Sequence, residues 1–293
     1  MDELKPLLAH ADRLLYRLER LLPEARDAAP DWTASNAFRW YRTSGGGHLH
    51  AIPKPHAISA SRLQRIDRQR QRLDRNTRQF VNGLPANNAL LWGSRGTGKS
   101  SLVKAMLQDY AAQGLRLIEV SPADLVDLPW IIEQVTDRPE RFILFCDDLS
   151  FEADDPGYKA LKASLDGSLS VAPENLLIYA TSNRRHLLPE SMRDNLDSHH
   201  VDGELHHGEA VEEKISLSER FGLWIAFRPF DQDAYLDIVD NWLRHYGLGL
   251  GHAPDTRERA LRYALERGSR SGRVAAQFAR DYAGLVGLEE RDA

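Results

Sequence analysis

The sequence has very little cysteine and no long apolar segment. Its 293 residues contain one cysteine, Cys146, which excludes an internal disulfide and cannot by itself form a metal–thiolate site. No apolar run reaches the length of a membrane span, and the first five residues, MDELK, lack the basic start and apolar centre of a signal peptide. We therefore expect a protein of the reducing cytoplasm that does not enter a membrane.

An excess of positive charge is also lacking. The formal net charge is -5 at pH 7, so the chain as a whole attracts neither nucleic acid nor an anionic membrane, and any such contact requires a local patch. Hydrophobic residues make up 42% of the chain, which is enough to bury a substantial core. The length predicts one large domain with a smaller one, or two unequal domains.

A glycine-rich segment follows the apolar residues Leu90 to Trp92 and fits the phosphate-loop pattern G-x-x-x-x-G-K-[ST]. It consists of Gly93, Ser94, Arg95, Gly96, Thr97, Gly98, Lys99, Ser100 and Ser101. Glycines let backbone N–H groups turn towards phosphate oxygens, and the start of the following helix directs its positive dipole end at the same anion. Lys99 can reach the outer phosphates, and Ser100 can offer its hydroxyl to Mg²⁺. The alternative is a tight glycine turn without a ligand.

Apolar strand patterns alternate with helical patterns through the middle of the chain. Strands are predicted at residues 88–92, 115–120, 141–148, 176–183 and 224–227, with helices after the phosphate loop, at 124–135, around 158–165 and at 215–221. Continuous apolar strands are buried on both faces, so this order predicts a mostly parallel sheet covered by helices. Residues 194–214 are polar and predict a loop. Beyond Pro229 the pattern is purely helical and predicts a small domain of three helices.

The first sixty residues are organised differently. Leucines recur at steps of three and four over residues 2–22, which predicts an amphipathic helix that packs on this chain or docks to a partner. Residues 31–58 contain Trp32, Phe38, Trp40 and Tyr41 together with three successive glycines, and predict an irregular, partly ordered connector. We therefore expect an N-terminal helical extension and connector over residues 1–60, an α/β core over 61–229 and a helical lid over 230–293.

Residues 61–80 are dense in arginine and predict a helix with a narrow apolar side. The arginines are Arg62, Arg65, Arg68, Arg70, Arg72, Arg75 and Arg78, against only two aspartates. Such a helix can grip a phosphate backbone, but a solvated face or a surface between subunits fits the same pattern. Nucleic acid stays one of three interpretations for this segment.

Polar residues follow two of the apolar strands, where a parallel sheet places its ligands. Asp147 ends one strand and can hold Mg²⁺ beside Ser100, while the next residue, Asp148, can orient or deprotonate a water that attacks the γ-phosphate. Asn183 follows another strand and can hydrogen-bond that water or the phosphate. The alternative for Asp148 and Asn183 is capping of their own loops.

These parts together resemble the AAA+ ATPases over about Ile66 to Leu285, and within them a bacterial family of unknown function. The resemblance rests on the phosphate loop and on the segments PANN at 85–88, CDDLSFE at 146–152, SNRRHLLP at 182–189 and LSERFGL at 217–223. It implies a P-loop parallel sheet with a C-terminal helical lid, hydrolysis of ATP with Mg²⁺, and assembly into homo-oligomers.

The resemblance also implies roles for individual residues. Asn183 matches sensor 1, Arg220 matches an arginine finger that reaches a neighbouring subunit's nucleotide, and Ser271-Gly272-Arg273 matches sensor 2, whose arginine closes the lid over the phosphates. Ile66 and Asp67 match the linker that contacts adenine. Arg220 could instead pair with an acidic surface residue of its own chain.

The sequence leaves three hypotheses of function. The first is an oligomeric ATPase that acts on an unknown macromolecule. The others are an ATP-switched nucleic-acid-binding protein, like replication initiators and helicase loaders, and a small-molecule phosphotransferase.

Two further segments bear on function. Residues 124–130 lack the aromatic–glycine pair of protein-threading relatives, which counts against an unfoldase. Histidines at 199, 200, 206 and 207 lie in the polar loop, where adjacent pairs aim poorly at one metal ion, so we expect a surface loop there.

Overall fold

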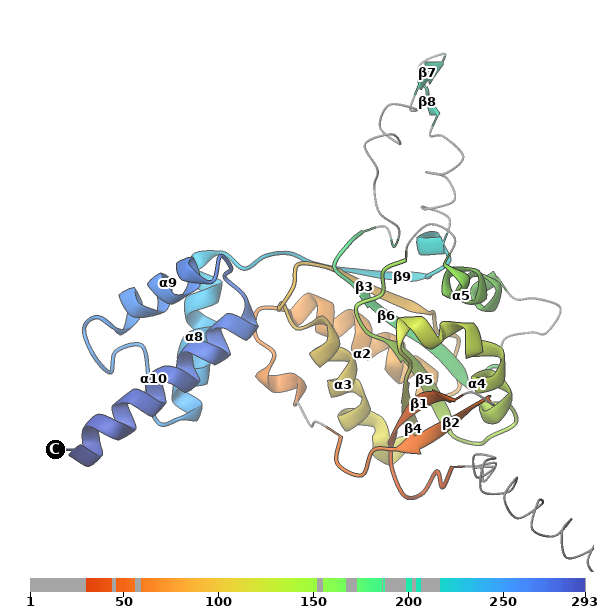
Figure 1. Ribbon diagram of the computed structural model, residues 1–293, viewed down its shortest axis with the longest axis horizontal. Helices are drawn as coiled ribbons and strands as arrows, with labels where there is room; N and C mark the ends of the chain where they lie inside the picture. Colours follow the sequence, from red (N-terminus) through yellow and green to blue (C-terminus); the bar gives the residue numbers. More distant parts are fainter. Residues whose placement is uncertain are drawn as a thin grey trace, which may run out of the picture.

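A seven-stranded sheet forms the centre of the α/β core (Figure 1). The computed structural model describes residues 30–43, 46–55, 59–151, 155–166, 173–185, 187, 199–201, 204–206 and 217–292. The strands are β1 (Ala37–Thr43), β2 (Gly46–Ala51), β3 (Ala89–Gly93), β4 (Leu115–Glu119), β5 (Arg141–Cys146), β6 (Leu176–Ser182) and β9 (Leu223–Phe227). Their order is β2-β1-β4-β5-β6-β3-β9, and every neighbouring pair is parallel except β1 with β2. The predicted mostly parallel sheet is confirmed.

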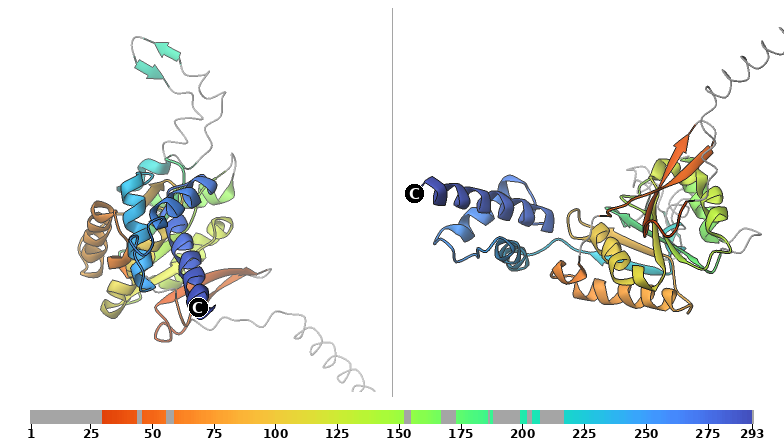
Figure 2. Two further views of the ribbon diagram at one scale, coloured as in Figure 1. Left: turned by 90° about the vertical axis from the view of Figure 1, so that its left-hand side faces the viewer. Right: turned by 90° about the horizontal axis from the view of Figure 1, so that it is seen from below.

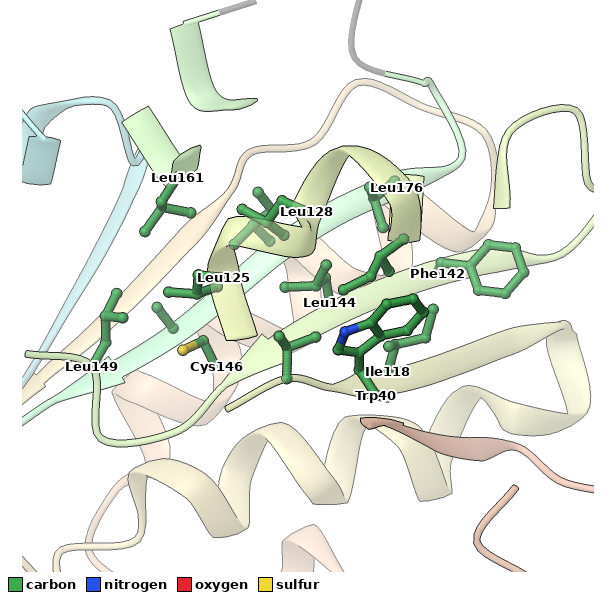
Figure 3. Close-up of a cluster of buried hydrophobic side chains, with 14 of the residues drawn as sticks. Trp40, Ile118, Leu125, Leu128, Phe142, Leu144, Cys146, Leu149, Leu161 and Leu176 are labelled. Atoms are coloured by element: carbon green, nitrogen blue, oxygen red, sulfur yellow. The ribbon is translucent and has the colours of Figure 1, made fainter. Parts of the chain in front are cut away.

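Helices cover both faces of this sheet. Alternate residues of each strand point to opposite sides, so the apolar strands have two faces to bury. The helices α2 (Asp67–Val81) and α3 (Lys99–Tyr110), with η1 (Ala60–Arg62) and η2 (Ala111–Gln113), lie on one face, where Leu117 and Ile143 are buried with Leu73 and Met106. The elements η3 (Pro122–Asp127), α4 (Leu128–Val135) and α5 (Pro156–Asp166) cover the other face. Figure 3 shows this second core, in which Ile118 and Leu144 lie beneath Leu125, Leu128 and Leu161.

The structure corrects the irregular connector expected over residues 31–58. The strand β1 pairs in parallel with β4, and its buried Phe38 and Trp40 alternate with the exposed Arg39 and Tyr41, which is the pattern of a half-buried strand. Trp40 lies among the core side chains of the sheet in Figure 3. A Cβ on Gly47 of β2 would come within 2.0 Å of the Trp40 ring, so this glycine makes room for the indole and is not part of a loop.

Two further segments differ from expectation. The arginine-dense helix begins at Asp67 and not at 61, because Ile66 is buried as the residue before the helix and Arg65 has a left-handed backbone with φ of 61°. Within the segment predicted as a loop, β7 (His199–Val201) and β8 (Glu204–His206) pair antiparallel. The other residues of that loop, among them His207, lie outside the described residues, as do residues 215–216 and the predicted helix over 2–22.

Three helices follow the sheet, as predicted. They are α8 (Gln232–His245), α9 (Thr256–Glu266) and α10 (Gly272–Asp292), and they share their own apolar core, which includes Tyr235, Val239 and Phe278. Asp231 caps α8 by accepting a hydrogen bond from the N–H of Ala234 at 2.8 Å. Figures 1 and 2 show this helical lid beside the sheet, reached by the chain after β9. Within the described ranges, no helix combines the length and apolar character needed to cross a bilayer.

Candidate nucleotide site

The phosphate loop lies between β3 and α3, as the sequence predicts. Gly93, Gly96 and Gly98 have φ of 121°, 71° and 99°, values that disfavour residues with a side chain. A Cβ on Gly93 would lie 2.1 Å from the carbonyl oxygen of Phe227 in β9, so glycine is required there for packing as well as for backbone conformation. Within the loop, Arg95 is exposed and buried Thr97 donates to the Ser94 carbonyl at 2.8 Å, while Ser100 and Ser101 lie in the first turn of α3.

Lys99 is buried at the centre of this loop. Its Nζ donates to the carbonyl oxygens of Gly93 at 2.7 Å and Ser94 at 2.8 Å, and to Oδ1 of Asn183 at 3.2 Å. Burial lowers the pKa of the Lys99 ammonium, and the carboxylates of Asp148 and Asp147 act in the opposite direction. The positive charges of Arg95 and Arg273 add to the lowering of this pKa. Three cations thus surround the loop, and an anion such as a phosphate group would relieve their repulsion.

Asp147 joins the phosphate loop to the ends of β5 and β6. Its Oδ1 accepts hydrogen bonds from Ser100 Oγ at 2.5 Å and from Thr181 Oγ1 at 2.6 Å. A carboxylate beside a serine hydroxyl is the type of oxygen ligand set that Mg²⁺ prefers when it also binds substrate phosphates. The residues present therefore fit the metal ion that the sequence implies.

Asp148 is held in an unusual conformation next to the same groups. Its φ of 54° is uncommon for a residue with a side chain, and such conformations concentrate at functional sites. The Asp148 N–H donates to Thr181 Oγ1 at 2.9 Å, and Asn183 Nδ2 donates to the Asp148 carboxylate. Asn183 therefore connects Lys99 of the phosphate loop to Asp148, so the structure brings all three predicted residues together.

Thr181 is a site residue that the sequence analysis did not single out. Its hydroxyl donates to Asp147 and accepts from the backbone of Asp148, and its side chain is buried. The available signal was a polar residue at the end of an otherwise apolar strand. That signal becomes informative only when β5 and β6 are known to be neighbours.

The lid contacts the phosphate loop directly. The N–H of Gly272 donates to the carbonyl oxygen of Gly96 at 2.9 Å, and Ser271 is buried at this contact. A Cβ on Gly96 would lie 2.8 Å from Ser271 Oγ, and one on Gly272 would lie 3.2 Å from the Gly96 carbonyl oxygen. Arg273 follows immediately and is exposed. The structure thus brings this predicted lid arginine to the edge of the loop.

The predicted adenine contacts lie beside the same loop. Buried Ile66 places its Cδ1 3.6 Å from the position of a Cβ on Gly98, and Asp67 opens α2 and forms an ion pair with Arg70. A cavity of about 570 Å³ opens between this linker and α8. It is lined by Leu63, Gln64, Arg65, Asp67, Arg70, Asp237, Asp240, Asn241 and Arg244, and an Arg65–Asp237 ion pair joins its two sides.

Arg220 lies away from the phosphate loop of its own chain. It shortly precedes β9, whose first residue, Leu223, pairs with Ala89 at the amino end of β3, whereas the loop follows the carboxyl end of β3. Its Nε donates to the carboxylate of Asp166 at the end of α5. Pairing with an acidic residue was the alternative interpretation for Arg220, and a finger role in a second subunit stays a prediction.

The chain matches one family model and is similar in fold to several solved structures. The family model described as "Protein of unknown function (DUF815)" matches residues 33–286. The Thermotoga maritima RuvB Holliday junction branch migration motor matches with a TM-score of 0.52 and 15% identity, over 79% of this chain and 67% of that chain. The Aeropyrum pernix ORC1 protein in complex with DNA matches with a TM-score of 0.51 and 15% identity, over 80% of this chain and 62% of that chain. Curated protein sequences gave no match. The shared fold is that of the AAA+ P-loop ATPases, as the sequence resemblance implied.

Proposed function

The chain belongs to the DUF815 family and has the AAA+ fold, and we propose that it is a Mg²⁺-dependent ATPase. One observation carries this proposal. Hydrogen bonds run from Lys99 through Asn183 to Asp148, and from Ser100 through Asp147 to Thr181, so the phosphate loop is joined to the acidic strand ends. A purely structural glycine turn would not require a buried lysine, two carboxylates and an amide in one network.

The cations of the loop bind the triphosphate. Lys99 takes the outer phosphates in exchange for its contacts to the loop carbonyls, and backbone N–H groups of residues 93–101 cradle the others. Arg273 approaches the phosphates from the lid because Gly272 docks on Gly96. The adenine lies against Ile66 and Asp67, beside the cavity between the linker and α8.

Ser100 and Asp147 hold the Mg²⁺ ion, which supplies neutralisation of the charge that develops on the phosphates during transfer. Asp148, whose backbone is left-handed, accepts a proton from, or orients, the attacking water. Asn183 fixes that carboxylate through its amide nitrogen. These roles divide the two adjacent aspartates, one for the metal ion and one for the water.

The active assembly is a homo-oligomer in the cytoplasm. Arg220 lies at the edge of the sheet opposite to its own phosphate loop, so it serves as an arginine finger only for a neighbouring subunit. Hydrolysis then moves the lid, residues 230–293, against the core, residues 61–229 with β1 and β2, and this movement acts on a macromolecule. The RuvB motor acts on Holliday junctions and the ORC1 structure contains DNA, which makes nucleic acid the first target to test.

Two substitutions test the ATPase proposal. Lys99→Ala removes the buried phosphate-binding charge and should abolish tight ATP binding in calorimetry, whereas Lys104→Ala on the same helix should bind like the wild type. Asp148→Asn should bind ATP normally and release phosphate about 10² to 10⁴ times more slowly, the usual range for loss of a general base. Unchanged ATP affinity in Lys99→Ala, with circular dichroism showing a folded protein, would refute the site.

A further inference from the structure

The helix α2 presents four exposed arginines on one face. Arg68, Arg72, Arg75 and Arg78 follow one another at steps of four, three and three residues, which keeps them on one side of a helix, and we name this face the α2 arginine surface. The opposite side of the helix packs Leu73 and Phe80 into the core. Both views of Figure 2 show α2 at the outer edge of the core.

These four arginines are not neutralised within the part of the chain that the structure describes. None of them forms an ion pair or side-chain hydrogen bond with a described residue, although exposed arginines elsewhere do so. Those pairs include Arg244–Asp240, Arg259–Asp255 and Arg262–Glu258. The two carboxylates of α2 are both engaged elsewhere, since Asp67 pairs with Arg70 and Asp74 accepts from Tyr110 at 2.7 Å. The α2 arginine surface therefore carries uncompensated positive charge on a protein whose net charge is -5.

The chemistry of this face fits a uniformly anionic ligand. The other exposed residue between Arg68 and Arg78 is Gln71, an amide, and no exposed apolar or aromatic side chain interrupts the helix there. Cores of protein–protein interfaces are enriched in aromatic residues as well as arginine, and this face has no exposed aromatic or apolar side chain, so it is poorly suited to a protein partner. A face of guanidinium donors without carboxylates matches phosphate oxygens, which accept from arginine in bidentate geometry.

We propose that the α2 arginine surface binds the phosphate backbone of a nucleic acid duplex. Steps of three and four residues separate the arginines by about 4.5 to 6 Å along the helix axis. A duplex offers one charge per roughly 1.7 Å of its axis, so each guanidinium can reach a different phosphate. The face lacks the aromatic platforms on which single-stranded bases stack, which favours a duplex. The proposed contacts are to backbone phosphates, which carry no sequence information directly, so we expect the binding to be independent of sequence.

A salt titration tests this inference with the full-length chain in the absence of nucleotide. The probe is a fluorescent DNA duplex of mixed sequence, and binding is followed by anisotropy. Four phosphate contacts predict a slope of log K against log salt of about -3 to -4, and therefore roughly a hundredfold loss of affinity between about 50 and 200 mM salt. The combined variant Arg68→Gln, Arg72→Gln and Arg75→Gln should reduce the slope by about one unit for each arginine that no longer binds a phosphate. Glutamine keeps the helix propensity of arginine, so α2 should stay folded.

A matched control removes the same charge from another helix. Arg257→Gln, Arg259→Gln and Arg262→Gln on α9 lower the net charge by the same three units, but these arginines already have carboxylate partners. This control should keep the wild-type slope. A duplex RNA of the same sequence distinguishes the two sources of backbone, because DNA and RNA duplexes differ in groove shape and in the 2′-hydroxyl.

Several results would overturn the inference. They are absence of duplex binding at about 50 mM salt, an equal loss of affinity in the α9 control, and tighter binding of the single strand than of the duplex. If the wild type does not bind the duplex, and the α2 substitutions change the molecular mass of the protein particle in light scattering, the surface contacts a second copy of the chain. Hydrolysis of ATP is measured separately, so this inference can fail while the proposed ATPase stands.

Discussion

A single hydroxyl group links both acidic residues of the candidate site. Thr181 Oγ1 donates to the Asp147 carboxylate at 2.6 Å and accepts from the backbone N–H of Asp148 at 2.9 Å. The first bond fixes the proposed metal ligand, and the second supports the left-handed backbone of the residue proposed to act on water. Removing this hydroxyl should therefore affect the metal site and the water site together.

Replacing Thr181 by valine tests that coupling, because valine keeps the branched shape and exchanges the hydroxyl for a methyl group that cannot hydrogen-bond. Loss of partners that orient metal ligands typically costs about 10- to 100-fold in metal affinity or activity, so we expect a loss of that size in phosphate release and a higher Mg²⁺ requirement. Thr181→Ser keeps the hydroxyl and should recover most of the activity. ATP affinity measured in EDTA separates this role from general misfolding, since it should change little. An unaltered Mg²⁺ titration in Thr181→Val would remove Thr181 from the site.

At the scale of elements, the sequence predicts best what neighbouring residues determine. The strands β5 and β6 are continuous apolar runs, and the phosphate loop has fixed spacing, so the sequence predicts these elements where the structure has them. The strand β1 escapes prediction because its stability comes from β4, whose Ile118 pairs with Phe38 from far along the chain. Thr181 escapes prediction for the same reason, since its partners Asp147 and Asp148 belong to the neighbouring strand end.

The start of α10 offers a test of the contact between the lid and the phosphate loop. Gly272→Ala places a Cβ about as close to the Gly96 carbonyl as packing tolerates, at 3.2 Å, without requiring a left-handed backbone. We expect the lid to shift and to withdraw Arg273. The close contact requires a shift of a few tenths of an ångström, and because a displacement of about 1 Å can cost up to about 10² in rate, phosphate release should fall by up to roughly tenfold.

The control for this substitution lies in the same helix. A Cβ on Gly284 would have no neighbour within 4 Å, so Gly284→Ala should stabilise α10 by up to about 1 kcal/mol and leave hydrolysis unchanged. Thermal melting checks the first expectation and phosphate release checks the second. If Gly272→Ala hydrolyses ATP as fast as Gly284→Ala does, docking of the lid on Gly96 has no part in the reaction.

At the scale of the whole molecule, the two edges of the parallel sheet carry different polar residues. The carboxyl edge carries the phosphate loop, Asp147, Asp148 and Asn183, and the lid contacts it through Gly272. The amino edge carries Arg220, which pairs with Asp166 in a single chain. A sheet separates the two, so one chain cannot bring its own Arg220 to its own nucleotide. If Arg220 acts as the proposed finger, the site needs the amino edge of one subunit to meet the carboxyl edge of another.

Arg220→Ala tests this arrangement, because a finger acting on a neighbour leaves its own nucleotide pocket intact. The variant should bind ATP like the wild type and hydrolyse it far more slowly, since fingers supplied by a partner accelerate phosphoryl transfer by about 10³ to 10⁵. Asp166→Asn is the matched control, because it removes the intrachain partner of Arg220 and keeps the guanidinium. Its hydrolysis should not fall. A wild-type rate in Arg220→Ala would leave Arg220 a structural role within its own chain, such as its ion pair with Asp166.

Mixing two inactive variants gives the sharper test. Arg220→Ala retains an intact phosphate loop, and Lys99→Ala retains an intact Arg220, so a mixed interface can contain one complete site. Two inactive proteins should therefore recover activity together, and the recovery should rise with total protein concentration because it depends on association. Adding Asp148→Asn to the Arg220→Ala chain should abolish the recovery, because the only complete pocket then lacks its carboxylate. If the subunits co-assemble by light scattering and the mixture still hydrolyses no ATP, Arg220 does not act across a subunit boundary.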